Sequence, residues 1–137
     1  MSEVLSEKNI LITGATSGIG LELTKSFAMK GANIIMLGKN EEKLDSLYDE
    51  ISSHGGKNLI IKSDLRELNE EGSIQISNEI KKHYSNVDGL VHNAAILGNL
   101  TRIQDYHSET WDDVLQVNLT VSFLITKHLL DLVFSSK

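Results

Sequence analysis

The residues best suited to chemistry form a glycine cluster near the start of the chain, Thr13-Gly14-Ala15-Thr16-Ser17-Gly18-Ile19-Gly20. An apolar run leads into the cluster and a helix-like stretch leads out of it, so it joins a strand to a helix N-terminus. The free N–H groups and the dipole of a first helical turn bind anions. Gly14 would allow the tight turn, Gly18 would let a phosphate approach, and Gly20 would let the helix pack on the strand. We therefore predict a dinucleotide phosphate site formed by Gly14, Thr16, Ser17, Gly18, Ile19 and Gly20.

The cluster also has alternative explanations. Glycines gather in ordinary turns, and the spacing Gly-x-x-x-Gly-x-Gly departs from the usual dinucleotide pattern Gly-x-Gly-x-x-Gly. A P-loop is excluded because no Gly-Lys-Ser/Thr closes the cluster. A nucleophile elbow is excluded because Ala15 stands where the glycine two residues before Ser17 would be. The position between a strand and a helix is what favours the dinucleotide site.

Strand-like and helix-like segments alternate along the whole chain. Short continuous apolar runs predict buried strands over residues 9–12, 33–37, 58–62 and 87–92. Helical periodicity predicts helices over residues 21–30, 41–53, 73–84 and 108–134. A β-α unit repeated four times implies an α/β fold with a doubly wound (Rossmann) parallel sheet between two helical layers. We expect one such domain to span residues 1–137.

Composition excludes several functional classes. Apolar residues make up 40% of the chain and charged residues 23%, which is typical of a globular domain rather than a disordered one. A net charge of −6 without a basic block disfavours a nucleic-acid partner. The sequence has no cysteine, and its five histidines lack metal-ligand spacing, so we predict no thiol chemistry and no metal site. No signal peptide and no apolar run of membrane-spanning length is visible, so we expect a cytoplasmic protein without a membrane partner.

Further motifs follow the glycine cluster in register. Asp64-Leu65 follows the third predicted strand, Asn93-Ala94-Ala95 follows the fourth, and Val117-Asn118-Leu119 lies in the last helix. Together with the glycine cluster, this series closely resembles the short-chain dehydrogenase/reductase family over the whole sequence. The resemblance implies an oxidoreductase that transfers hydride between a nicotinamide cofactor and a carbonyl or alcohol, and thus a small-molecule substrate.

The resemblance also implies roles for individual residues. Asp64, with Leu65 beside it, would hydrogen-bond the adenine amino group, although an Asp there also suits the N-cap of a short turn. Asn93, Ala94 and Ala95 would lie along the adenosine. Because Ala95 stands where the family has glycine, we expect no left-handed backbone there. We interpret His92, which precedes this turn, as a packing residue at the strand end rather than a base.

Asn118 would belong to a catalytic tetrad, in which its backbone carbonyl holds a water of a proton relay that reaches a catalytic lysine. From the residues alone, the default for an Asn inside a helix is a side chain facing solvent. A helical stripe nevertheless predicts that Asn118 faces the core, among Trp111, Leu115, Ser122, Ile125 and Leu129.

The end of the second predicted strand favours NADP, with NAD as the alternative. In dinucleotide folds an acid at this point binds the ribose 2′-hydroxyl and repels a 2′-phosphate. Here the sequence continues as Lys39-Asn40, without an acid, and Lys39 could meet a phosphate unless it is simply a solvated lysine. Both residues are therefore predicted cofactor contacts. Ser17 argues against a strong preference, because many NADP-using members carry a basic residue in the glycine loop.

The residues that handle the proton in this family are not found in the sequence. The family uses a tyrosine with a lysine four residues later and a serine, whereas Tyr48, Tyr84 and Tyr106 are followed by Ser52, Asp88 and Thr110. We therefore expect the chain to be the cofactor-binding half of a family domain, a fragment truncated before that segment. The parent would be an oxidoreductase, often a homo-oligomer. Two alternatives are a nucleotide-binding sensor and a half-domain completed by a separate chain.

Overall fold

The computed structural model describes residues 3–136, and a four-stranded parallel sheet lies at its centre. The strand order is β3-β2-β1-β4, with β1 (Asn9–Thr13), β2 (Asn33–Gly38), β3 (Leu59–Lys62) and β4 (Gly89–Val91). β1 pairs in parallel with β2 on one side and with β4 on the other. The predicted doubly wound α/β fold is confirmed.

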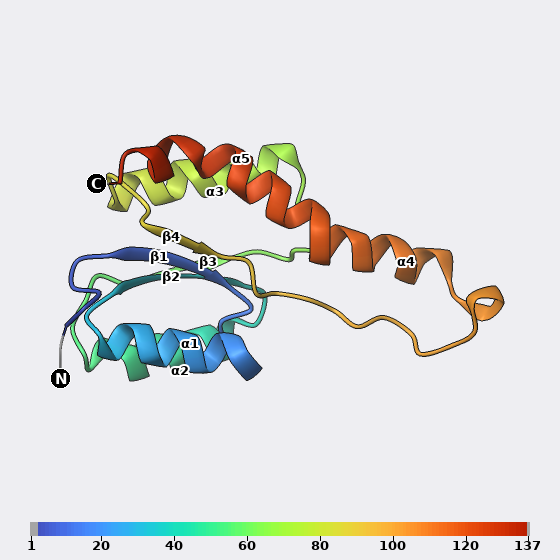
Figure 1. Ribbon diagram of the computed structural model, residues 1–137, viewed down its shortest axis with the longest axis horizontal. Helices are drawn as coiled ribbons and strands as arrows, with labels where there is room; N and C mark the ends of the chain where they lie inside the picture. Colours follow the sequence, from blue (N-terminus) through green and yellow to red (C-terminus); the bar gives the residue numbers. More distant parts are fainter. Residues whose placement is uncertain (1–2, 137) are drawn as a thin grey trace.

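Helices cover both faces of this sheet (Figure 1). On one face lie α1 (Gly18–Met29) and α2 (Glu41–Ser52), and on the other lie α3 (Glu70–His83) and α5 (Val121–Phe134). The chain alternates between strand and helix, and each helix carries it back to the amino ends of the strands, so that all paired strands are parallel. All four strands therefore present their carboxyl ends, and the loops that follow them, on one side of the molecule.

Asparagine side chains mark where two of the helices begin. The Asn40 side chain accepts a hydrogen bond from the Lys43 N–H at 3.0 Å, and that of Asn69 accepts one from the Gly72 N–H at 2.8 Å. Both helices carry two glutamates in the first turn, where the helix dipole favours negative charge. The cap at Asn69 starts α3 at Glu70, three residues before the predicted start.

The predicted helix over residues 108–134 is divided by a change of helical pitch. It consists of α4 (Ser108–Leu115), a π-helical turn over Gln116–Thr120 and α5. The predicted core-facing stripe is correct for Ile125 and Leu129 but wrong for Trp111, Leu115 and Asn118, which are exposed. α4 projects beyond the sheet, so none of the four described strands lies beneath its apolar residues (Figure 1).

The same helical run corrects the expectation that no segment reaches membrane-spanning length. Ser108–Phe134 has the length and the mean hydropathy, 1.4 over its most apolar window, of a membrane-spanning helix. A core helix of a globular domain meets the same criteria. In this structure α5 packs on α3, where the Ser77 hydroxyl donates to the His128 carbonyl at 2.7 Å and Lys127 pairs with Glu70 at 2.6 Å.

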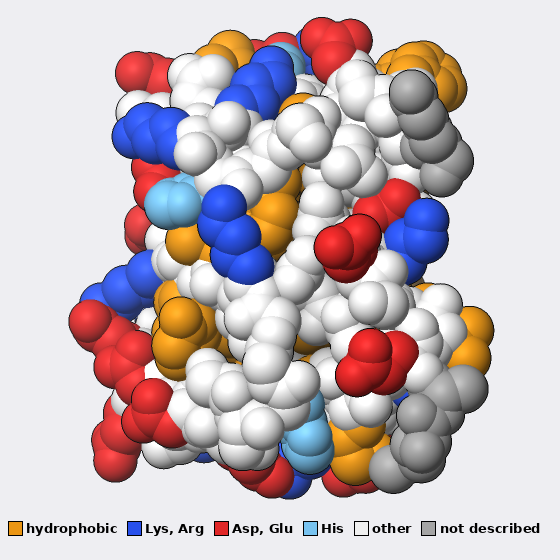
Figure 2. All heavy atoms as spheres, turned by 90° about the vertical axis from the view of Figure 1, so that its left-hand side faces the viewer, with side chains coloured by type: hydrophobic (Ala, Val, Ile, Leu, Met, Phe, Trp, Pro, Cys, Tyr) orange, Lys and Arg blue, Asp and Glu red, His pale blue; other side chains and the backbone are white. Residues whose placement is uncertain are grey.

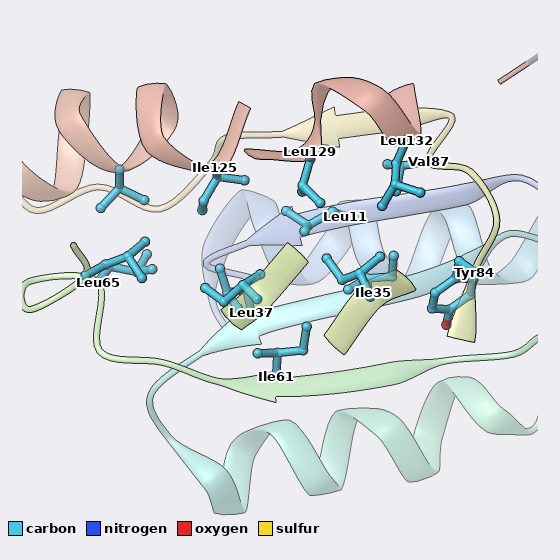
Figure 3. Close-up of a cluster of buried hydrophobic side chains, with 14 of the residues drawn as sticks. Leu11, Ile35, Leu37, Ile61, Leu65, Tyr84, Val87, Ile125, Leu129 and Leu132 are labelled. Atoms are coloured by element: carbon cyan, nitrogen blue, oxygen red, sulfur yellow. The ribbon is translucent and has the colours of Figure 1, made fainter. Parts of the chain in front are cut away.

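Two hydrophobic clusters fill the space between the sheet and its helices. Because side chains alternate along a strand, Leu11 and Ile35 face α5 while Ile12 and Ile34 face α1 and α2. Figure 3 shows the first cluster, in which Leu129 and neighbouring side chains of α5 lie against the sheet. These clusters fix the strand ends and thus the positions of the loops.

The amino ends of the strands are held by a polar network. Asp88 accepts a hydrogen bond from the Asn9 N–H at 2.8 Å and lies 3.6 Å from the Lys8 ammonium. The Val87 N–H donates to the Leu132 carbonyl of α5, so β4 is shorter than predicted. Figure 2 shows this end of the molecule, where acidic and basic side chains are interspersed. The candidate site residues lie at the opposite end of the sheet, where the strands have their carboxyl ends.

Candidate cofactor-binding site

A cleft of about 370 Å³ lies at the carboxyl ends of the four strands, where ligands bind in open α/β sheets. Loops after all four strands line it. The predicted residues that the structure brings together there are Gly14, Thr16, Ser17, Lys39, Asn40, Asp64, Leu65, Asn93, Ala94 and Ala95. Gly18, Ile19 and Gly20 are predicted residues that lie outside this lining, at the start of α1.

The backbone geometry of the glycine loop agrees with the predicted turn at Gly14 and the predicted close packing at Gly20, while the phosphate contact of Gly18 stays a prediction. Gly14 and Gly18 adopt left-handed backbone conformations, with φ of +64° and +53°. A Cβ at Gly20 would overlap the Gly14 carbonyl and the Asn93 side chain, so only glycine permits this close packing. A Cβ at Gly18 would meet no atom within 4 Å, so the backbone there faces open space. The loop therefore fits a phosphate group beside Gly18.

The start of α1 is suited to an anion. The helix begins at Gly18 rather than at the predicted Leu21, so the last glycines of the cluster form its first turn. Its N-cap, Ser17, makes no side-chain capping bond, and the first turn contains no acidic residue. The first-turn N–H groups, which helix geometry leaves without intrahelical partners, therefore lie beside the glycine loop. Ile19, in the same turn, is 74% exposed.

A network around Thr13 joins the glycine loop to the loop after β4. The buried Thr13 hydroxyl accepts hydrogen bonds from the Asn93 N–H at 3.1 Å and the Ala94 N–H at 3.0 Å. The Asn93 side chain donates to the carbonyls of Thr13 and Gly14 at 3.2 and 3.1 Å. Ala95 has no positive φ, as expected. Thr13 is a structural contributor that the sequence did not assign, although it opens the glycine cluster.

Lys39 and Asp64 form an ion pair across the cleft, from the ends of β2 and β3. The Lys39 ammonium lies 3.1 Å from the Asp64 carboxylate, and the other carboxylate oxygen accepts a hydrogen bond from the Arg66 N–H at 3.1 Å. The hydrogen bond from Lys39 lowers the pKa of the Asp64 carboxyl, against the opposing effect of burial. Asp64 therefore caps the turn after β3, which is the structural role given above as its alternative. Its contact with adenine stays a prediction.

Several residues of the lining were missed by the sequence analysis. Arg66 adds a second cation to the cleft, and the signal that could have found it is its position two residues after Asp64 in the same loop. The others are backbone or apolar contacts without a distinctive sequence signal, namely Leu37, Gly38, Ser63, Ile96 and Val117.

Asn118 lies in the π-helical turn, and its side chain is exposed rather than buried. Its amide oxygen accepts a hydrogen bond from the Ile96 N–H at 2.8 Å, and its amide nitrogen donates to the Ile96 carbonyl at 3.0 Å. The side chain thus fixes the loop after β4, and these two hydrogen bonds account for an Asn inside a helical segment. π-Helical turns occur often at functional sites. The role of the Asn118 carbonyl in a proton relay stays a prediction.

Two other titratable side chains near the sheet have structural roles. The His92 ring is hydrogen-bonded to the Thr126 hydroxyl at 2.8 Å, and partial burial lowers its pKa. The Tyr84 hydroxyl donates to the Lys57 carbonyl, and burial raises its pKa to about 12. An activated tyrosine has a lowered pKa, so Tyr84 is not activated for proton transfer. Residues 3–136 contain no group of three or more side chains arranged to hold a metal ion.

Comparison with known proteins identifies the family to which this chain belongs. A family model described as short chain dehydrogenase matches residues 8–137. The chain belongs to the short-chain dehydrogenase family. It is 36% identical over 137 residues to the uncharacterized oxidoreductase YciK of Escherichia coli K12, covering 98% of this chain and 54% of that protein. A 3β-hydroxysteroid dehydrogenase of Mediterraneibacter gnavus is 31% identical over 89% of this chain and 44% of its own length.

Solved structures of short-chain dehydrogenases share this architecture closely. A protein from Shigella flexneri 2a, complexed with NADP, matches with a TM-score of 0.95 and 34% identity. A protein from Escherichia coli CFT073, complexed with NADPH, matches with a TM-score of 0.93 and 34% identity. Both matches cover 100% of this chain and 58% of the solved chain. The chain thus spans about half the length of the short-chain dehydrogenases that it matches.

Proposed function

We propose that this chain forms the NADP(H)-binding part of an oxidoreductase that acts on a carbonyl or alcohol substrate. The observation that carries the proposal is the cleft lined by Gly14, Thr16 and Ser17, with the open backbone of Gly18 at the adjoining start of α1 and a cation, Lys39, at the end of a strand that carries no acid. The NADP and NADPH bound by two structural neighbours support the choice of cofactor.

The residues that line the cleft, and the start of α1 beside it, each have a proposed role in cofactor binding. The first-turn N–H groups of α1 and the loop at Gly18 would bind the pyrophosphate. Lys39 would meet the 2′-phosphate, and Asp64 would accept a hydrogen bond from the adenine amino group. Asn40 and the loop after β4 would position the adenosine. The cofactor supplies or accepts the hydride.

Proton transfer requires groups beyond those described above. None of the three tyrosines is followed four residues later by a lysine, and Tyr84 is held as a structural hydrogen-bond donor. We therefore assign substrate binding and proton transfer to the portion of family members that this chain does not span. The 137-residue chain alone should bind cofactor without oxidising it.

Calorimetric titration with NADP and NAD, NADPH and NADH tests the proposal. We expect the phosphorylated cofactors to bind more tightly, because only they engage Lys39. The Lys39→Met variant should lose most of this difference, while Lys43→Met, which removes an exposed cation from α2, should not. Tighter binding of NAD would overturn the proposed cofactor. Oxidation of NADPH by this chain with a carbonyl substrate would overturn the assignment of proton transfer.

A nucleotide-binding module is the second candidate, because the cleft is formed while the tyrosine–lysine pair is not found in the sequence. A half-domain completed by a separate chain is the third, since β4 pairs only with β1 among the described strands. Sequencing the gene beyond codon 137 separates them from the first: a serine and a Tyr-x-x-x-Lys segment there would exclude both. A cytoplasmic location and a homo-oligomeric full-length protein remain part of the proposal.

A further inference from the structure

Three charged side chains from the loops after the adjacent strands β2 and β3 line the cleft. Lys39 follows β2, while Asp64 and Arg66 follow β3, and all three line the cleft. The ammonium and the carboxylate are 3.1 Å apart, within ion-pair distance. Lys39 is 72% exposed and Asp64 is 27% exposed, so the pair lies at the surface where a ligand can reach it.

This ion pair places a negative charge beside the cation that would recognise a phosphate. Asp64 is ionised at neutral pH, since the hydrogen bond from Lys39 lowers its pKa. A dianionic phosphate that approaches the ammonium must therefore share it with a carboxylate already in contact. A cofactor without the 2′-phosphate meets no such competition, because its ribose hydroxyl carries no charge.

We propose that Asp64 restrains the preference for NADP over NAD by holding Lys39 in this ion pair. The inference rests on the proposed function, in which Lys39 faces the 2′-phosphate. Asp64 then has two separable effects on the cofactor. Its contact with adenine would strengthen both cofactors equally, whereas its pairing with Lys39 would weaken only the phosphorylated one.

The test uses two small probes that occupy only the adenosine part of the cleft. These are 2′,5′-ADP and 5′-AMP, which differ by the 2′-phosphate alone. The dissociation constant of 5′-AMP divided by that of 2′,5′-ADP measures the preference for the 2′-phosphate without any turnover. In Asp64→Asn the amide still accepts the Arg66 N–H, so the turn after β3 is retained. Asp131→Asn, at the exposed end of α5, is the matched control for a loss of one negative charge.

We expect Asp64→Asn to raise the preference for 2′,5′-ADP about two- to fivefold, the range that an exposed ion pair supports. Asp131→Asn should change it less than about 1.5-fold, because screening removes distant surface charges. In a Lys39→Met background, the effect of Asp64→Asn should disappear. Circular dichroism of each variant establishes that it is folded before the titrations are compared.

The outcomes separate this inference from the proposed function. If wild-type protein binds neither probe, or binds both equally in every variant, the proposed NADP site itself fails. If wild type prefers 2′,5′-ADP and Asp64→Asn leaves or lowers the preference, the inference alone is overturned. An Asp64→Asn effect that persists without Lys39 also overturns it, because the carboxylate would then act directly on the phosphate.

Discussion

At the scale of single residues, Gly18 and Gly20 show that two glycines of one cluster can be required for different reasons. Gly18 has positive φ and open space, while Gly20 has ordinary φ and no space. The first is a requirement of backbone conformation and the second is one of packing. Substitution by alanine should therefore have different local consequences at the two positions.

We expect Gly20→Ala to break the contact between the glycine loop and Asn93, because the added methyl group overlaps both. Overpacking of this kind costs about 1–3 kcal/mol of unfolding free energy. Gly18→Ala should cost about 1–2 kcal/mol through its left-handed backbone, without disturbing Asn93. Amide hydrogen exchange distinguishes them: protection at Asn93 and Ala94 should fall in Gly20→Ala only. Equal exchange in both variants would contradict the assignment.

Asp64 provides a prediction of pH dependence. Because Lys39 lowers the carboxyl pKa below the ordinary value of 3.8, the ion pair adds to folding stability above that value. This contribution is lost as the pH falls through the lowered pKa of the folded state. In Lys39→Met the pKa should rise toward 3.8, which an NMR titration of the carboxyl carbon measures. Lys62→Met, which removes the partner of Glu41, is the control and should leave Asp64 unchanged.

The predictable part of the site is the part that depends on backbone geometry. Gly14, Gly18 and Gly20 can be assigned from spacing, since turn conformation and packing leave few alternatives to glycine. The Lys39–Asp64 pair joins two loops 25 residues apart, and nothing local in either loop specifies that its side chain points toward the other. Thr13 was missed for the same reason, because its role comes from the fold rather than from its neighbours in sequence. Arg66, by contrast, could have been found from its position two residues after Asp64.

At the scale of elements, the π-helical turn explains why the last helix was only partly predicted. Periodicity places Ile125 and Leu129 correctly because α5 lies on the sheet. The same period fails for Trp111 and Leu115, since the pitch changes at Gln116–Thr120 and α4 extends past the sheet (Figure 1). The strand and helix order, by contrast, follows from alternating apolar patterns that each strand and helix carries by itself.

Asn118 ties this turn to the loop after β4. We expect Asn118→Ala to lose both hydrogen bonds to Ile96 and to lower the free energy of unfolding by about 1–2 kcal/mol. Hydrogen exchange at the Ile96 amide should accelerate, because its acceptor is removed. Asn118→Asp retains the acceptor and should protect that amide more than alanine does. An Ile96 amide that exchanges equally in wild type and Asn118→Ala would contradict this role.

At the scale of the whole molecule, apolar residues form an exposed stripe on the last helix. Leu119, Phe123, Leu130 and Phe134 recur at helical spacing and are between 40% and 77% exposed. Among the described strands, β4 also has only one neighbour, which leaves an open edge. Apolar patches and open edges of this kind favour association. The homo-oligomer expected of the full-length protein stays a prediction.

We expect the 137-residue chain to self-associate, which sedimentation velocity over a range of concentrations would measure. Phe123→Ser should weaken the association because it interrupts the stripe. Val4→Ser is the control, since Val4 is also exposed but lies near the N-terminus. A monomer with sharp, reversible unfolding would contradict the prediction. Equal weakening by both variants would show that the stripe is not the interface.

The uncapped start of α1 has a consequence for how much of this protein a cell can maintain. α2 and α3 begin with their own asparagine caps, whereas α1 begins with N–H groups that a bound phosphate would satisfy. Ligand at about 100 times its dissociation constant would add about 2.7 kcal/mol to the folded state. Folded protein is what escapes degradation, so abundance should rise and fall with the nucleotide supply. The bound dinucleotide would then stabilise the folded state of the domain that binds it.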